Sequence, residues 1–107
     1  MTYIKIKPGV VLDGIQPVTL RMWADVAEVY YSFGYPCVVT SGLDGKHKSK
    51  SLHYVGKALD FRTHIIPNGK EEELRDAVAK RLGTNFDVLF ESEGKPWEHL
   101  HAEYDPD

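Results

Sequence analysis

Apolar and polar residues follow a helical pattern in two parts of this chain. Between Pro17 and Phe33, apolar side chains recur at steps of three and four residues, which is the spacing of one buried helix face. Pro17 suits the first turn of a helix, and Gly34 suits its end. A second amphipathic segment covers residues 70–82, with acidic residues in its first turn and Gly83 after it. The pattern therefore predicts two helices.

Strands are predicted where apolar and polar residues alternate, or where a short apolar run lies between turn residues. The first such segment alternates Ile and Lys until Pro8 and Gly9 stop it. The last two segments flank residues 93–96, whose Gly and Pro predict the turn of a β-hairpin. The polar stretch 41–51 is predicted to be a loop. In chain order the predicted strands are residues 3–7, 36–40, 58–62, 86–92 and 97–104.

This order of strand, helix, strands, helix and hairpin predicts an α+β fold. We expect a mainly antiparallel sheet with the helices packed on one side. The chain has 107 residues, which is the size of one domain, so residues 1–107 are treated as a single domain.

Composition excludes several classes of partner. The net charge is −3 at pH 7 and no basic stripe is present, so nucleic acid is not an expected partner. No stretch approaches the roughly 20 apolar residues that span a bilayer, so no membrane is expected either. The N-terminus lacks the apolar core of a signal peptide, so we expect synthesis in the cytoplasm. The single cysteine, Cys37, excludes an internal disulfide and is predicted to be a small buried side chain. No protein partner is implied.

Two short segments carry most of the side chains that bind metals or transfer protons. They are Ser51-Leu-His53-Tyr-Val-Gly56-Lys-Ala58-Leu-Asp60 and Glu98-His99-Leu-His101. On a strand, side chains two positions apart share a face, so His99 and His101 address the same side of the sheet. Two histidines and one carboxylate leave a fourth zinc position open, as in catalytic zinc sites.

Each of these residues also has an ordinary structural interpretation. His53 alone is more often a surface or half-buried histidine than a ligand, and Asp60 alone can be a turn or helix cap. The two histidines of the second segment can be cross-strand partners on a wet sheet face, and Glu98 can be an exposed hairpin residue. Their joint occurrence, with small residues between His53 and Asp60, favours a metal site.

The two segments resemble a known family when their spacing is taken together. Ser51-x-His53-x-x-Gly56-x-Ala58-x-Asp60 followed by Glu98-x-x-His101 is similar to the M15 family of zinc peptidases. These include D-alanyl-D-alanine carboxypeptidases and the L-alanyl-D-glutamate endopeptidases that serve as phage endolysins. Asp44-Gly45-x-His47 and Arg62-Thr63 resemble small phage-encoded members. The resemblance implies the D-Ala-D-Ala carboxypeptidase/hedgehog type of fold and one zinc ion.

The resemblance also implies roles for individual residues. His53, Asp60 and His101 would bind zinc, Glu98 would be the general acid/base, and His99 would lie beside the metal and steady an oxyanion. Zinc lowers the pKa of a bound water to about 7, and a nearby carboxylate accepts its proton as it attacks a peptide carbonyl. Positions 98 and 101 face opposite sides of an ideal strand, so we expect Glu98 to lie where the strand begins.

Three residues are candidates for binding substrate, namely Arg62, Lys46 and His47. Arg62 shares strand parity with Asp60, so it can point into the same cleft and bind a carboxylate, although a surface salt bridge is an alternative. Lys46 and His47 are alternatives from the polar loop. Ser51 is expected to hydrogen-bond within its loop or to Asp60 and so orient a ligand.

The activity that the resemblance implies is hydrolysis of a bond in the peptide stem of bacterial peptidoglycan. The enzyme would be a DD-carboxypeptidase or an LD-endopeptidase, acting at the cell wall or periplasm if it is a phage endolysin. A metal-binding virion or structural domain with little or no catalysis is the alternative. Glu98 favours an enzyme, because a binding domain has no need for an acid three residues before a ligand.

Overall fold

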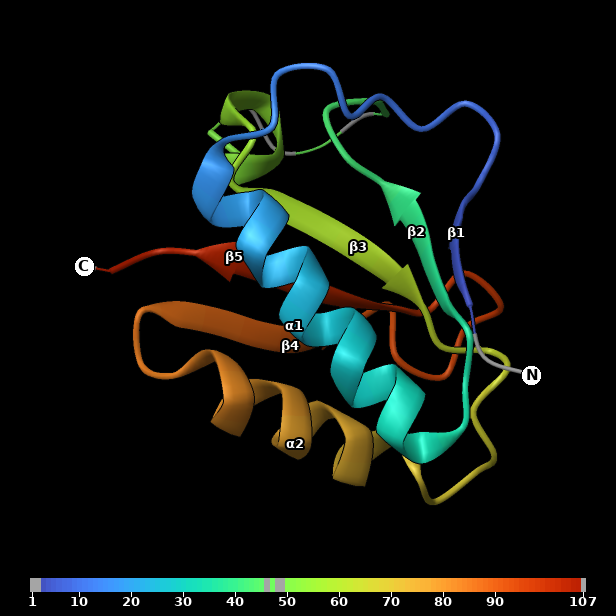
Figure 1. Ribbon diagram of the computed structural model, residues 1–107. Helices are drawn as coiled ribbons and strands as arrows, with labels where there is room; N and C mark the ends of the chain where they lie inside the picture. The colour runs from blue at the N-terminus through green and yellow to red at the C-terminus, as the bar shows by residue number, and fades with distance from the viewer. Residues whose placement is uncertain (1–2, 46, 48–49, 107) are drawn as a thin grey trace.

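The structure, a computed structural model, describes residues 3–45, 47 and 50–106. Within them, a five-stranded sheet packs against two helices in an α+β arrangement (Figure 1). The helices are α1 (Pro17–Phe33) and α2 (Glu71–Leu82), and a short 3-10 helix, η1, covers Leu52–Val55. The strands are β1 (Ile4–Ile6), β2 (Cys37–Ser41), β3 (Ala58–Arg62), β4 (Phe86–Glu91) and β5 (His99–Tyr104). The predicted helices and strands are confirmed with small shifts at their ends, whereas η1 was not predicted.

The sheet is mixed, with the strand order β1-β2-β3-β5-β4. β1 and β2 pair in parallel, and the three other pairings are antiparallel. The parallel pair is joined through α1, which is the kind of crossover that a parallel connection requires. The expected hairpin is formed by β4 and β5; β4 is the edge strand opposite β1, and β5 lies between β4 and β3.

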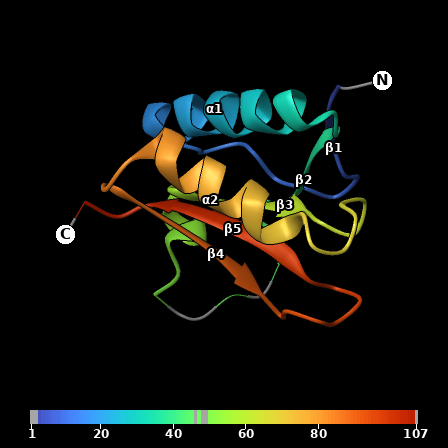
Figure 2. The same ribbon diagram turned by 90° about the horizontal axis from the view of Figure 1, so that it is seen from below.

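Both helices cover the same face of the sheet, as Figure 2 shows. Between helices and sheet lies the core, in which Met22, Val26 and Tyr30 of α1 are almost completely buried. The hydroxyl of Tyr30 donates a hydrogen bond of 3.0 Å to the carbonyl oxygen of Arg62 and so ties α1 to the end of β3. The remaining core is formed by α2 and by alternate residues of the strands, including Leu74, Val78, Val39, Leu59, Phe61, Leu100 and Ala102.

Two expectations from composition concern burial and membrane segments. Cys37 is 1% exposed, and burial raises the pKa of its thiol to about 12, which suits the small apolar role predicted for it. In the part of the chain that the structure describes, neither helix combines the length and the apolar character needed to cross a bilayer.

Strand alternation leaves a second set of side chains on the face that the helices do not cover. On β5 the residues Leu100 and Ala102 enter the core, so His99, His101 and Glu103 point to the open face. The open face therefore carries the polar residues of the second motif.

Candidate metal centre

The open face of the sheet holds a cavity of about 1180 Å³. Its walls come from the adjacent strands β3, β5 and β4 and from the segment that joins β2 to η1. The first sequence motif reaches this cavity through η1 and β3, and the second reaches it through β5. The fold thus brings together two segments that are far apart in the sequence.

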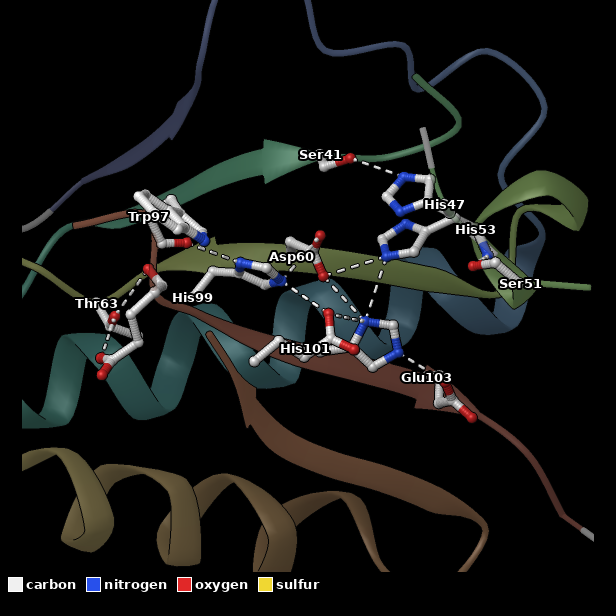
Figure 3. A network of polar contacts seen from close by, with 12 residues as sticks. Ser41, His47, Ser51, His53, Asp60, Thr63, Trp97, His99, His101 and Glu103 are labelled. Carbon is white, nitrogen blue, oxygen red and sulfur yellow. Dashed lines mark hydrogen bonds and ion pairs between the residues drawn. The ribbon is translucent and has the colours of Figure 1, made fainter. Parts of the chain in front are cut away.

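Three ligand atoms of His53, Asp60 and His101 meet in this cavity (Figure 3). The Nε2 atom of His53 lies 3.1 Å from Oδ1 of Asp60 and 3.2 Å from Nδ1 of His101. That Nδ1 atom lies 2.9 Å from the same oxygen of Asp60. The three residues are buried, with exposed fractions of 2%, 4% and 5%. The structure therefore groups the three residues that the resemblance assigned to the metal.

Each histidine of this group uses its other ring nitrogen as a hydrogen-bond donor. Nδ1 of His53 lies 2.8 Å from the carbonyl oxygen of Gly42, which can only accept. Nε2 of His101 lies 2.6 Å from a carboxylate oxygen of Glu103. A neutral histidine has one N–H, so these bonds leave the lone pairs of His53 Nε2 and His101 Nδ1 facing Asp60. Metal-binding histidines typically hold their second nitrogen in this way.

Three acceptor atoms this close together are stabilised by a positive charge among them. A proton on His101 is one source: burial lowers its pKa, but hydrogen bonds to Asp60 and Glu103 outweigh burial and raise the pKa to about 9. For Asp60, burial raises the pKa, whereas hydrogen bonds with His101 and His53 lower it well below its usual range. A divalent cation is the other source of positive charge, and it would contact the same atoms of His53, Asp60 and His101.

The separations fit a small tetrahedral cation. Zinc–ligand bonds of about 2.0–2.2 Å place neighbouring ligand atoms roughly 3.3 Å apart in a tetrahedron. The three observed separations are 2.9, 3.1 and 3.2 Å. Two imidazole nitrogens and one carboxylate oxygen form a donor set that zinc accepts, and they leave a fourth position for water or substrate. The residues present therefore fit a zinc ion.

Local turns place His53 beside the sheet. The hydroxyl of Ser51 accepts a hydrogen bond of 3.2 Å from the backbone N–H of His53 and caps η1, so Ser51 bonds within its own loop. Gly56 ends η1 with a φ of 74°, and a side chain there would overlap the carbonyl oxygen of Gly14. Glycine at this position is what allows the chain to turn between His53 and Asp60.

Strand register places the other two ligands. β3 and β5 pair so that Asp60 lies directly opposite His101, and Arg62 lies opposite His99. Directly opposite residues of an antiparallel pair have neighbouring side chains on the same face. The carboxylate of Asp60 and the ring of His101 therefore meet without any special loop geometry.

His47, a predicted substrate-binding residue, packs directly on His53. The two rings are stacked, with centroids 3.9 Å apart and an angle of 7° between them. Nε2 of His47 lies 2.8 Å from the carbonyl oxygen of Asp44 and 3.2 Å from the hydroxyl of Ser41. His47, His53 and Asp60 offer ligand atoms within 4.8 Å of one another. His47 is thus also a candidate ligand, and its role in substrate binding stays a prediction.

The sequence pattern did not single out Glu91, which ends β4 and lies directly opposite His99. Its Oε1 atom lies 2.8 Å from Nε2 of His99 and 3.7 Å from Nδ1 of His101. Glu91, Asp60 and His101 also offer ligand atoms within 4.8 Å of one another. Alternation along residues 86–92 does put position 91 on one face, but it does not say which strand lies alongside. Glu103 was also missed, although it lies two residues after His101 on the same strand, where alternation puts both side chains on one face.

Glu98 precedes β5, as expected, and its carboxylate is engaged away from the three ligand residues. One oxygen accepts a hydrogen bond of 2.8 Å from the hydroxyl of Thr63, and the other accepts one of 3.1 Å from the N–H of Gly94. Partial burial raises the pKa of Glu98, but these hydrogen bonds outweigh it and hold the pKa below its usual value. Glu98 lines the cavity as an ionised carboxylate whose role in catalysis stays a prediction.

Arg62 also lines the cavity, as its parity with Asp60 indicated. No ion pair joins Arg62 to another residue in the described part of the chain, so the surface salt bridge considered for it is not formed there. Lys46, the other cationic candidate, lies outside the described residues.

Comparison with models of known protein families finds no match to this chain, and a search of curated proteins finds no significant match. The resemblance to zinc peptidases therefore rests on the two sequence motifs alone.

Proposed function

We propose that this chain is a zinc-dependent peptidase that hydrolyses a bond in the peptide stem of bacterial peptidoglycan. The observation that carries the proposal is the convergence of one ring nitrogen from His53, one from His101 and one carboxylate oxygen of Asp60 in an open cavity. Their spacing and their hydrogen bonds suit one zinc ion with a free position. The peptidoglycan substrate comes from the resemblance of the two motifs to M15 peptidases.

The same resemblance supplies the finer expectations. The fold would be that of the D-Ala-D-Ala carboxypeptidase/hedgehog type, and the enzyme would be a DD-carboxypeptidase or an LD-endopeptidase. If it is a phage endolysin, it would act at the cell wall or periplasm.

A bound zinc ion would supply a Lewis acid that polarises the scissile carbonyl and lowers the pKa of a water molecule. The residues of the chain would supply the remaining steps. Glu98 and Glu91 both line the cavity, and a carboxylate there can accept the proton of the attacking water and pass it to the leaving amine. The resemblance gives His99 the role of steadying a developing oxyanion, and that role requires a proton on Nε2, the ring nitrogen beside Asp60. The guanidinium of Arg62 can bind a carboxylate of the peptide stem.

The test is a digest of purified peptidoglycan by the zinc-loaded protein, read by mass spectrometry. We expect new fragments whose masses name the bond that is cut. Glu98→Gln should keep zinc and lose activity by about 10²–10⁴-fold, the usual contribution of a general acid/base. Glu93→Gln is the matched control, because Glu93 is an exposed acid in the same turn and does not line the cavity.

Each outcome of the digest has a separate meaning. Full turnover by Glu98→Gln would show that Glu98 is not the general acid/base, and Glu91 would then be the candidate for that role. A protein that binds zinc yet releases no fragments from several wall chemistries would reject the peptidase.

A metal-binding domain without catalysis, such as a virion component, is the second candidate. One observation favours it: both carboxylate oxygens of Glu98 are already held, by Thr63 and by Gly94. A carboxylate used only to fix the turn before β5 would need no more than these two bonds. The digest separates this candidate from the peptidase.

A further inference from the structure

A second group of ligand atoms lies beside the proposed zinc site. Nε2 of His99 lies 3.4 Å from Oδ2 of Asp60 and 2.8 Å from Oε1 of Glu91. The two oxygens of Asp60 therefore face different partners, since Oδ1 faces His53 and His101. Figure 3 shows Asp60 with His99 on one side and the other two histidines on the other.

The hydrogen bond made by the other ring nitrogen of His99, Nδ1, determines whether Nε2 can act as a metal ligand. Nδ1 of His99 lies 3.2 Å from the carbonyl oxygen of Trp97, which can only accept a hydrogen bond. In a neutral ring the N–H is then on Nδ1, and the lone pair of Nε2 faces Asp60 and Glu91. The side chain of Asp60 is only 5% exposed, so water cannot readily satisfy its second oxygen.

We propose that Asp60 bridges two divalent cations, one held with His53 and His101 and the other held with His99 and Glu91. The second site shares Asp60 with the proposed zinc centre and so rests on that centre, but it does not depend on peptidase activity. Two-metal sites of hydrolases hold their ions about 3.5–4 Å apart. Imidazole nitrogen with carboxylate oxygen suits zinc and its first-row neighbours.

The register of three strands produces this arrangement. Asp60 of β3 lies opposite His101, and Glu91 of β4 lies opposite His99, with β5 between them. Because His99 and His101 are two positions apart on one strand, their side chains point to the same face and the two groups lie side by side.

Charge also favours a second cation. The carboxylates of Asp60, Glu91 and Glu103 all contact the histidines of the site. One divalent cation would balance two of these three negative charges, and Arg62, which lines the same cavity, forms no ion pair with any of the three carboxylates in the described part of the chain. A proton on Nε2 of His99 would also face Asp60 and Glu91. The number of bound metal ions therefore distinguishes a protonated His99 from a second cation.

Metal stoichiometry tests the proposal on the full chain. Protein stripped with chelator is dialysed against zinc, and separately against cobalt(II), and bound metal is counted by elemental analysis and native mass spectrometry. We expect two ions per wild-type chain. Glu91→Gln and His99→Gln should each bind one, because His53, Asp60 and His101 still hold the first ion; His99 is the cleaner position, since Glu91 also lies 3.7 Å from Nδ1 of His101. Circular dichroism checks that each variant is folded, and if Glu91→Gln fails to fold, His99→Gln carries the test.

Asp87→Asn is the matched control. Asp87 belongs to an acidic group with Glu103 and Asp105, and no hydrogen bond or ion pair joins it to His99 or Glu91 in the described part of the chain. This variant should still bind two ions. A second ion that is lost in Asp87→Asn and kept in Glu91→Gln would lie in the acidic group and would overturn the proposal.

The remaining outcomes also discriminate. One ion in the wild type would overturn the bridging role of Asp60. Peptidoglycan hydrolysis with one ion would leave the proposed function standing without the second site. Two ions with no hydrolysis would support the second site and reject the peptidase.

Discussion

The hydrogen bond between Glu103 and His101 provides a direct test of the metal centre. Nε2 of His101 lies 2.6 Å from Oε1 of Glu103, whose side chain is 20% exposed. The bond holds the ring with Nδ1 toward Asp60 and increases its electron donation. Replacing Glu103 should therefore weaken zinc binding although it removes no ligand of the proposed zinc ion.

The size of the effect follows from the kind of bond. Loss of such a partner typically lowers metal affinity about 10–100-fold, which is about 1.4–2.8 kcal/mol. The bond is short, charge-assisted and mostly buried, so Glu103→Ala should lie near the upper end of this range. Glu103→Gln keeps an oxygen acceptor and loses the charge, so about a tenfold loss is expected.

Competition with a chromogenic chelator measures the zinc affinity of each variant. Asp87→Asn is again the control, because Asp87 lies opposite Glu103 on β4 and is exposed, without a bond to His101. An affinity of Glu103→Ala within about twofold of the wild type would refute the reasoning, because it would fall far below the expected loss. An equal loss in Asp87→Asn would also refute it, since the effect would then come from charge and not from the hydrogen bond.

Two further predictions concern pH and the turn after η1. Burial lowers the pKa of His101, but its hydrogen bonds to Asp60 and Glu103 raise it to about 9, so zinc must displace a proton at neutral pH. Zinc affinity should therefore fall about tenfold for each pH unit below that pKa. Titration calorimetry in buffers of different ionisation enthalpy counts the proton that His101 releases when zinc binds. An affinity that does not change with pH would contradict the assignment of His101 as a zinc ligand. Gly56→Ala should lower the free energy of unfolding by about 2–4 kcal/mol, because its φ is 74° and the new methyl group would overlap the carbonyl oxygen of Gly14. Gly9→Ala, with a φ of 92° and open space around it, should lose only about 1–2 kcal/mol, and equal losses in urea denaturation would show that the overlap is relieved.

The helices and strands could be predicted from the sequence because each is set by a local pattern. Apolar residues recur every three or four positions before Gly34 because they form the one buried face of α1, and α1 ends at Phe33, directly before that glycine. The parallel pairing of β1 with β2 could not be predicted in this way. It depends on where α1 returns the chain, which is decided by packing between distant segments.

The candidate site divides along the same line. The sequence by itself determined that His99 and His101 share a face, because side chains on a strand alternate. The resemblance of its two motifs to zinc peptidases implied His53 and Asp60 as further ligands. Only the tertiary structure decided that Glu91 lies opposite His99 and that Glu98 is bound by Thr63. Register and turn contacts of this kind arise from hydrogen bonds and packing between segments far apart in the chain, and no local period encodes them.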